Sequence, residues 1–374
     1  MINKERLVNE FIRLVSIDSP SLSEKEMGEY LKSRLAELGF TVKEDDAGSR
    51  LNGNCGNIYG FLEGSRDMVP ILFCVHMDTV EPSRGKRAVL DSDGVIRSSG
   101  DTVLGADDCS GIAAILEALH TIREGGQEHR PIEVLFTVAE ESYCKGVKQF
   151  DFTDMIAKEA YVLDLSGPVG AAAYQAPTIL SFSVSVAGKA AHAGFAPHEG
   201  IHAVQAAADA IARLKLGRID DVTTLNIGVI QGGLATNIIP ESCAVRGEVR
   251  SYSHERAMEA AEEVRRQFKN SADSFGARIE FEVQNGGIAY ETPQDHSVVR
   301  RFEAACRTLG IPFSLQQTFG GSDNNVLAEH GITGIVLACA MNQCHSCEEY
   351  TTVDELVRIA ELTRVLMTSE GNTV

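Results

Sequence analysis

Apolar residues recur every three or four positions along the first forty residues, which is the helical period. They predict one helix over residues 7–15 and a second over residues 27–38. The pattern from Ser23 to Glu26 has the form of an N-terminal capping box, and Gly39 stands where a C-terminal stop is expected. The chain therefore opens with two amphipathic helices.

Short apolar runs follow, each ending in polar residues. Residues 70–75, 132–138 and 160–163 have the composition of strands that are buried on both faces, and a helical pattern starts at Asp108 between the first two. Strands that alternate with helices predict an α/β fold with a mixed, mostly parallel sheet, whose ligand sites lie beyond the carboxyl ends of the strands.

The middle of the chain has a different order of elements, which reads as βαββαβ, the ferredoxin-like arrangement. A unit of this kind is compact enough to be an inserted α+β domain. At 374 residues the chain exceeds the usual size of one core. We predict a discontinuous catalytic domain of residues 1–176 and 289–374, with residues 177–288 as the insertion. The predicted strands of the insertion are 179–186, 222–230, 243–250 and 278–283, and its helices are 200–214 and 254–268.

Composition narrows the classes of partner and compartment. The formal charge of −19 argues against binding to nucleic acid, and no apolar stretch approaches the ~18 residues needed to cross a bilayer. Nine cysteines in a chain without an export signal favour free thiols in a reducing compartment. We therefore expect a cytoplasmic enzyme or binding protein that acts without a membrane.

Candidate metal ligands stand at the ends of the predicted strands. His76 and Asp78 lie two apart in an extended segment, so their side chains face the same way, and Asp107 opens a helix. A polar strand end and a helix cap are the structural alternatives. The adjacent Glu140 and Glu141 are harder to explain in that way, because neighbouring carboxylates repel each other unless a cation lies beside them.

Asp164 ends the next strand, and His345 lies in a late segment between Cys344 and Cys347. Two histidines and three carboxylates, one of them bridging, can hold two divalent ions that keep an open position for water and substrate. Nitrogen and oxygen ligands of this mix suit zinc, with cobalt or manganese as possible substitutes. The two cysteines could instead form a redox or zinc pair, but no second CxxC accompanies them.

Taken in order along nearly the whole chain, these motifs resemble the family of co-catalytic di-zinc exopeptidases that includes peptidase T, acetylornithine deacetylase, succinyl-diaminopimelate desuccinylase and a glutamate carboxypeptidase. The matching segments are HMDTV, GADD, AEE, the Asp of VLDL, GKAAHAG, PHEGIHA, TNIIP, RGEVRS, GGSDNN and CHSCEE. The GADD segment most resembles the peptidase T branch. The resemblance implies a metal-dependent aminopeptidase that hydrolyses short, tripeptide-like substrates at the N-terminal residue.

The resemblance also implies roles for single residues. Two zinc ions per chain would be bound, one by His76 and Asp164 and one by Glu141 and His345, with Asp107 as the bridge. Asp78 would orient His76, and Glu140 would act as general base and then general acid. The inserted domain would serve as a lid and dimerisation domain, and its His192 would cross a homodimer interface to steady the oxyanion. Asn237 and Arg250 would hold substrate, and Gly320 and Gly321 would let backbone approach it.

Two departures concern specificity. Peptidase T has an arginine where this chain has Phe319, and many relatives have a lysine at the position of Cys109. An amidohydrolase or carboxypeptidase that acts on N-acyl amino acids or terminal residues is the alternative, because it would share the metal centre. A non-catalytic binding protein on the same fold is the more remote one, because such a protein normally lacks a ligand or the base.

Overall fold

The protein is described by a computed structural model for residues 1–369. Contacts divide it into two compact units. Unit 1 comprises Met1–Gln175, Glu291–Thr318 and the chain from Ser322 onward, and unit 2 comprises Ala176–Tyr290 with Phe319–Gly321. In the described part of the chain, no helix is both long and apolar enough to cross a membrane.

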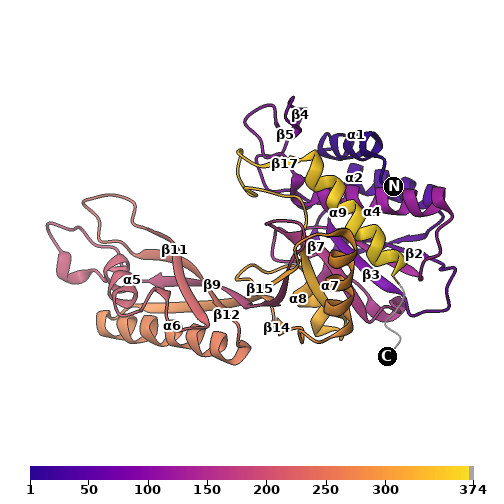
Figure 1. Cartoon of the computed structure of the whole chain (residues 1–374). Helices are drawn as coiled ribbons and strands as arrows, with labels where there is room; N and C mark the ends of the chain where they lie inside the picture. The colour runs from indigo at the N-terminus through magenta and orange to yellow at the C-terminus, as the bar shows by residue number, and fades with distance from the viewer. Residues whose placement is uncertain (370–374) are drawn as a thin grey trace. The chain divides into compact units, whose positions relative to one another are not determined.

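Unit 1 is built on a nine-stranded mixed sheet in the order β1-β2-β6-β3-β7-β16-β8-β14, with β15 paired to β8 (Figure 1). The central neighbours β6, β3, β7 and β16 run parallel, as predicted. The pairs β1–β2, β2–β6 and β16–β8 are antiparallel, and β15 pairs parallel with β8. The strands are β1 (Thr41–Glu44), β2 (Ile58–Leu62), β3 (Ile71–His76), β6 (Ile132–Thr137), β7 (Glu159–Leu165), β8 (Ala171–Ala176), β14 (Tyr290–Glu291), β15 (Ser314–Gln317) and β16 (Thr333–Ala338). A separate three-stranded sheet holds β4 (Ala88–Leu90), β5 (Val95–Ser98) and β17 (Tyr350–Thr352).

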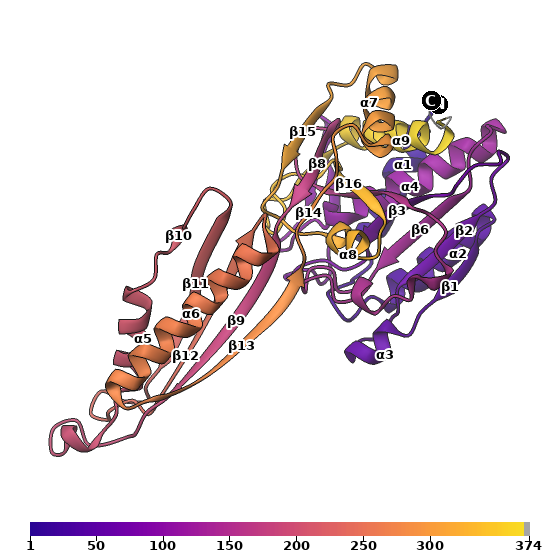
Figure 2. The same ribbon diagram turned by 90° about the horizontal axis from the view of Figure 1, so that it is seen from below.

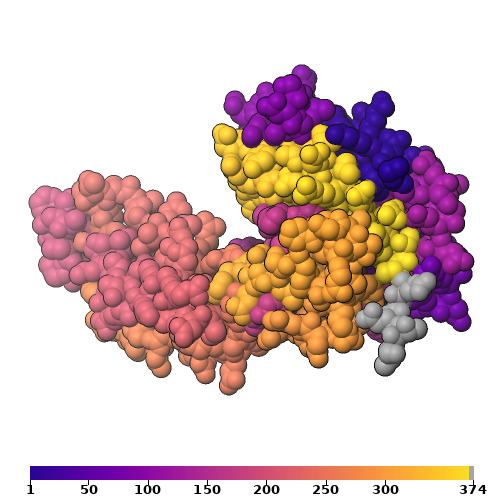
Figure 3. All heavy atoms as spheres, viewed as in Figure 1, coloured from indigo at the N-terminus to yellow at the C-terminus, as the bar shows by residue number. Residues whose placement is uncertain are grey.

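Helices cover both faces of this sheet. One face packs against the helices α1 (Lys4–Val15), α2 (Lys25–Leu38), α4 (Ala106–Gly125), α7 (Ser297–Leu309) and α9 (Val353–Thr368). The other face is closed by α8 (Asp323–Glu329), the short helix η1 (Val147–Gln149) and loops. The first and last helices, α1 and α9, contact each other, and the indigo and yellow surfaces lie side by side in Figure 3.

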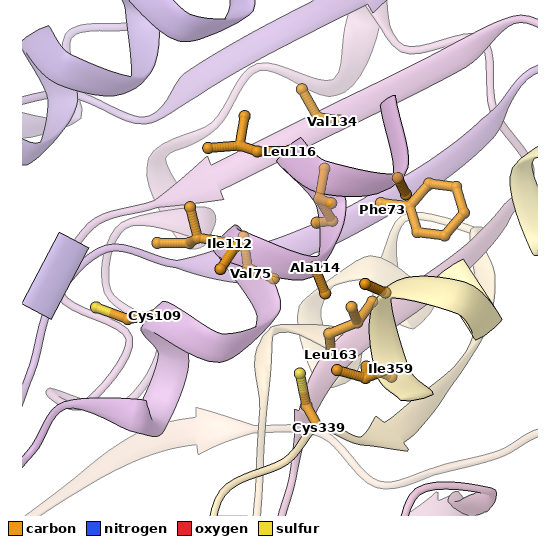
Figure 4. Close-up of a cluster of buried hydrophobic side chains, with 14 of the residues drawn as sticks. Phe73, Val75, Cys109, Ile112, Ala114, Leu116, Val134, Leu163, Cys339 and Ile359 are labelled. Carbon is orange, nitrogen blue, oxygen red and sulfur yellow. The ribbon is translucent and has the colours of Figure 1, made fainter. Parts of the chain in front are cut away.

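The main core lies between the sheet and helices α4 and α9 (Figure 4). Phe73 and Val75 point to this side from β3, and Ile112 and Leu116 meet them from α4. All four side chains are almost completely buried, and burial of each contributes about 1.5–3 kcal/mol. This packing fixes the position at which α4 begins, next to the carboxyl ends of the strands.

Unit 2 is the predicted βαββαβ arrangement, with its strands in the order β10-β11-β12-β9-β13 and all neighbours antiparallel. Its two long helices lie on one face of this sheet (Figure 2). The elements are β9 (Thr178–Ala187), η3 (Pro197–Glu199), α5 (Ala203–Ala212), β10 (Gly217–Arg218), β11 (Thr223–Gly232), β12 (Ser242–Ser251), α6 (His254–Phe275) and β13 (Arg278–Gly287). The remaining elements, α3 (Ala47–Leu51) and η2 (Phe152–Asp154), belong to unit 1.

The capping pattern of the second helix was predicted wrongly. The structure starts α2 at Lys25 with Glu24 at the capping position, and Ser23 does not cap it. Glu24 is completely buried, and its carboxylate accepts hydrogen bonds from the backbone N–H groups of Leu22 and Ala139. Neither of these N–H groups belongs to α2, so the helix begins without a side-chain cap from Ser23 or Glu24. The stop at Gly39 is confirmed, with a left-handed φ of 95°.

One buried ion pair joins the sheet to α7, and it generates a prediction about acid stability. Glu159 lies 2.6 Å from Arg301, and both side chains are largely buried. Burial alone would raise the pKa of Glu159, but the Ser297 hydroxyl and the Arg301 guanidinium outweigh it and hold that pKa below the ordinary value of 4.5. The pair therefore stabilises the fold fully above pH 4.5, and this contribution falls as the pH drops through the lowered pKa.

We expect Glu159→Gln to lower the free energy of unfolding by about 3 kcal/mol at pH 7, because it leaves Arg301 buried without its partner. The difference from wild type should shrink as the pH falls below 4.5. Urea unfolding of the metal-free proteins at a series of pH values measures it. Glu303→Gln in the same helix is the control, since its pair with Arg307 is exposed and should contribute less than about 1 kcal/mol. A difference for Glu159→Gln that does not change with pH would contradict the assignment.

Candidate metal centre and active site

Parallel pairing brings three of the predicted site segments to one edge of the unit 1 sheet. His76 is the last residue of β3 and stands opposite Thr137, the last residue of β6. Asp164 lies near the end of β7, the other neighbour of β3. Helix α4 begins at the same edge and supplies Asp107, after which the Asp107–Asp108 peptide bond is cis.

Asp107 lies between the two histidines, with one carboxylate oxygen facing each. Its Oδ1 is 2.9 Å from Nε2 of His76, and its Oδ2 is 3.3 Å from Nε2 of His345. Oε1 of Glu141 lies 3.1 Å from the same nitrogen of His345, and Oδ1 of Asp164 lies 3.9 Å from that of His76. The five predicted metal ligands thus form two groups that share Asp107.

The donor set fits two divalent cations. His76, Asp107 and Glu141 place ligand atoms within 4.8 Å of one another, and so do His76, Glu140 and Asp164. Glu141 Oε1 is buried and accepts no hydrogen bond. Within residues 1–369 no lysine or arginine pairs with any of these carboxylates. Two imidazoles cannot balance four buried carboxylates, so bound cations are the natural compensation.

The pKa values of the site residues show the same imbalance of charge. Burial raises the pKa of Glu140 and of Asp164, and the neighbouring negative charges raise it further. The contacts of His345 Nε2 with the carboxylates of Asp107 and Glu141 raise the pKa of His345 to about 11. Burial by itself would lower the pKa of His76, but its hydrogen bond to Asp107 raises that pKa overall. The carboxylates therefore favour positive charge at both histidines, which bound cations would supply instead.

Asp78 holds the loop that carries the two glutamates. Its carboxylate accepts hydrogen bonds from the backbone N–H of Glu140, at 2.9 Å, and of Glu141, at 3.3 Å, and also from the hydroxyl of Ser21. His76 Nδ1 lies 2.8 Å from the backbone carbonyl of Asp78 and 3.6 Å from its carboxylate. The predicted contact with His76 is thus made mostly through the backbone, and the Asp78 side chain orients the glutamates.

Glu349 is a site residue that the sequence reasoning missed. It is 1% exposed, and its two carboxylate oxygens accept hydrogen bonds from the backbone N–H of Gly105 and of Asp107, at 2.6 and 2.9 Å. It therefore fixes the segment that presents Asp107. In the sequence Glu349 is the second glutamate of the segment CHSCEE, and that segment does not indicate that the side chain is buried.

Asp323, in the GGSDNN segment, was also missed. It is 1% exposed, and it accepts a hydrogen bond of 2.5 Å from the Thr137 hydroxyl at the end of β6. Its carboxylate lies within 4.8 Å of ligand atoms of Glu140 and Cys144. The Cys144 thiol lies 3.3 Å from Glu140 Oε1, to which it donates. Glu140 thus sits among acidic groups with one weak donor beside it, and burial raises the pKa of Asp323 to about 6.

In unit 2 the structure brings His192 and Asn237 together on neighbouring loops. His192 and Ile238 form an isolated β-bridge. The backbone carbonyl of Asn237 accepts a hydrogen bond from the backbone N–H of Ala193, the residue after His192. Nδ1 of His192 accepts hydrogen bonds from the N–H groups of Gly194 and Phe195, each at 3.1 Å. The neutral imidazole therefore carries its proton on Nε2, which is an available donor.

Arg250 already has a carboxylate partner in the same strand. Its guanidinium binds Glu248 through Nε and Nη2, at 2.9 and 3.0 Å, and its Nη1 donates to the carbonyl of Phe319 at 2.7 Å. Gly320 and Gly321 follow directly and belong to unit 2. Arg250 thus secures the segment that contains the two glycines.

The cysteines form no metal or redox pair in the described residues. All nine are free, and Cys344 contacts the hydroxyl of Ser166 at 3.3 Å. No group of candidate metal ligands contains Cys344 or Cys347. The CxxC interpretation therefore finds no support.

Comparison with known proteins agrees with this geometry. A family model described as a peptidase dimerisation domain matches residues 175–275, and one of peptidase family M28 matches residues 57–213. The chain superposes on a tripeptidase from Staphylococcus aureus with a TM-score of 0.95 and 33% identity, and on the aminopeptidase PepT from Bacillus cereus with 0.91 and 38%. Each comparison covers 98% of both chains.

A curated relative gives a third comparison. The chain is 32% identical to carboxypeptidase G2 of a Pseudomonas strain over 79% of this chain and 71% of that one. A fold with a catalytic sheet and an inserted dimerisation-type domain, carrying a two-histidine carboxylate centre, defines a metallopeptidase. The chain belongs to the M20 family of peptidases.

The contact of Glu349 with the Asp107 segment generates a prediction about metal retention. We expect Glu349→Gln to weaken metal binding by about 10- to 100-fold, because an amide has only one acceptor for two backbone N–H groups. Competition with a chromophoric chelator measures this directly. Glu348→Gln is the matched control, since that neighbouring side chain is exposed. Equal affinities in the two variants would show that Glu349 does not position Asp107.

Proposed function

We propose that the protein is an aminopeptidase that removes the N-terminal residue from short peptides. The observation that carries this proposal is the placement of His76 and His345 on the two oxygens of Asp107, because a shared carboxylate is what a two-metal hydrolase requires. The similarity to a tripeptidase and to an aminopeptidase over 98% of the chain supports the choice of substrate.

Zinc is the proposed metal, with two ions per chain. Imidazole nitrogens and carboxylate oxygens suit zinc, and cobalt or manganese could replace it. In the proposal His76 and Asp164 would hold one ion, Glu141 and His345 would hold the other, and Asp107 would contribute to both. When bound, the two ions polarise the scissile carbonyl and lower the pKa of water.

Glu140 is the proposed general base. Its backbone is held by Asp78, and its carboxylate contacts no cation within the described residues, so it is free to accept a proton. It takes the proton of the attacking water and passes it to the leaving nitrogen. The thiol of Cys144 donates a weak hydrogen bond to one oxygen, which helps to fix the direction of the other.

Residues 177–288 are proposed to form a lid and dimerisation domain, in a homodimer whose subunits complete each other's sites. The family model for a dimerisation domain matches residues 175–275, which cover most of this region. The support for His192 is its tautomer, since Nε2 presents an N–H that can stabilise a developing oxyanion. Asn237 lies beside it and is the proposed second contact to substrate.

The alternative is hydrolysis of an N-acyl amino acid or of a C-terminal residue, which the 32% identity to carboxypeptidase G2 favours. The same metal centre would serve either reaction. A non-catalytic binding protein is disfavoured, because Glu140 and all five proposed ligands are present and gathered at one edge of the sheet.

The proposed reaction is tested by comparing trialanine with N-acetyl-trialanine as substrates of the zinc-loaded enzyme. An aminopeptidase should cleave only the peptide with the free amine, and preference for the acetylated form would establish the alternative.

We expect Glu140→Ala to keep its metal and lose nearly all turnover, whereas Glu141→Ala should lose metal. Metal analysis and single-turnover kinetics read out both, and exchanged phenotypes would reverse the roles of the two glutamates.

The homodimer generates a complementation experiment. His192→Ala should lower kcat by about 100-fold or more, as loss of an oxyanion donor does elsewhere. Mixed with Glu140→Ala and allowed to exchange subunits, it should recover up to about a quarter of wild-type activity, because half of the dimers then hold one complete site. Subunit exchange is verified by mass. Exchange without recovery would assign His192 to its own subunit or to the fold alone.

A further inference from the structure

A second set of candidate metal ligands lies beside the proposed catalytic centre, within unit 1. Glu140, Cys144 and Asp323 each place one ligand atom within 4.8 Å of the others. The three side chains are 9%, 4% and 1% exposed. In the described part of the chain this is the one candidate group that contains a sulfur atom, and it includes none of the five proposed zinc ligands. These donors are therefore not used by the two proposed zinc ions.

Asp323 brings a buried oxygen without a partner to this group. Its Oδ2 accepts the hydrogen bond from the Thr137 hydroxyl at 2.5 Å, and the Cys74 thiol lies 3.8 Å from the same oxygen. Its Oδ1 is buried and has no hydrogen-bond partner among residues 1–369. A buried carboxylate oxygen without a donor or a cation is unfavourable. Because Oδ2 is occupied, Oδ1 is the oxygen that is available to a ligand.

The loop after β6 brings the thiol of Cys144 to Glu140. Ala139, Tyr143 and Cys144 have left-handed φ values of 50°, 69° and 53°, although none of them is glycine. A backbone hydrogen bond of 2.7 Å from the N–H of Cys144 to the carbonyl of Glu140 closes the turn. Left-handed conformations of such residues are uncommon and concentrate at functional sites. The strained loop holds the Cys144 thiol 3.3 Å from Oε1 of Glu140.

The distance between these two atoms fits a single cation bound to both. A tetrahedral zinc ion with bonds of about 2.3 Å to sulfur and about 2.0 Å to oxygen separates the two ligand atoms by roughly 3.5 Å. The observed distance of 3.3 Å is close to this value. Asp323 would be the third ligand, and water would complete the tetrahedron. Because thiolate is a soft ligand, a site of this composition favours zinc over harder ions such as manganese.

We propose that Glu140, Cys144 and Asp323 form a third cation site, which binds zinc in excess of the two catalytic ions and thereby inhibits the enzyme. The ion bonds to Oε1 of Glu140, Oδ1 of Asp323 and Sγ of Cys144, and the thiol proton is released to water. Glu140 can then no longer accept the proton of the attacking water, so turnover stops while the two catalytic ions stay bound. The inhibition rests on the proposed function, whereas the binding of the ion does not.

The third ion should bind more weakly than the other two. Burial raises the pKa of the Cys144 thiol well above its usual value of 9.0, so the ion has to displace a firmly held proton. Two other divalent ions nearby would also repel it. The site should therefore fill only when free zinc exceeds the amount that the catalytic centre needs, and it should empty again when free zinc falls.

Cobalt titration tests the site without reference to activity. The two proposed catalytic positions offer nitrogen and oxygen ligands, so a thiolate-to-cobalt charge-transfer band reports a cysteine ligand. We expect two equivalents to bind without this band and the third equivalent to produce it. Cys144→Ser should abolish the band, and Asp323→Asn should weaken the third ion by about 100-fold or more. Cys55→Ser is the matched control, since Cys55 is also 4% exposed and belongs to no candidate ligand group.

Zinc titration of trialanine hydrolysis measures the inhibition. Wild-type activity should reach a maximum at two equivalents and fall by about 100-fold as the third ion binds, because the contribution of the general base is lost. A chelator that lowers free zinc to its earlier level should restore activity. Relative to its own maximum, Cys144→Ser should escape inhibition, and Cys55→Ser should not. Excess manganese should inhibit the manganese-loaded enzyme much less, because thiolate prefers the softer ion.

The two titrations separate the possible failures. Binding of only two cobalt ions, or of a third without the charge-transfer band, overturns the site, and so does a band that persists in Cys144→Ser. A third ion that produces the band but leaves turnover unchanged overturns the inhibition. If trialanine is not cleaved at any metal content, the proposed function fails, while the cobalt titration still decides whether the site exists. Thermal unfolding verifies the fold of each variant.

Discussion

The active site depends on one electrostatic constraint, the burial of four carboxylates beside two imidazoles at the end of the parallel strands of the unit 1 sheet. Asp107 is central to it, because its two oxygens each face one histidine. The favourable packing of α4 on the sheet holds this carboxylate in place although its desolvation is costly. Bound cations would relieve that cost, so the same arrangement that burdens the metal-free fold prepares the catalytic centre.

Backbone N–H groups carry much of the organisation around the centre. Asp78 binds the amides of Glu140 and Glu141, and Glu349 binds those of Gly105 and Asp107. Each of these acidic side chains orients a loop rather than a single ligand. A loop that is held at two nearby amides presents its side chains in a defined direction. A site for two ions and a reacting water requires such order.

Unit 2 contributes polar groups that its own sheet and loops have already oriented. The tautomer of His192 is set by two backbone N–H groups, and the plane of Arg218 is set by the ring of Phe319. Both side chains are therefore already ordered by contacts within the chain, and ordering of this kind lowers the entropic cost of binding a ligand. The placement of Phe319–Gly321 in this unit also makes a segment of the late chain a neighbour of Arg218 and Arg250.

The sequence by itself determined the elements and the kinds of ligand. Hydrophobic periodicity is local, so the alternating strands and helices, the βαββαβ insertion and the strand-end position of His76 could be predicted from short windows. Only the tertiary structure showed that Glu349 and Asp323 are buried beside the centre, that Glu24 replaces Ser23 at the start of α2, and that Arg218 meets Phe319. These contacts join segments that are far apart in the chain. Packing decides them, and no local pattern of residues records which distant side chain will fill a given space.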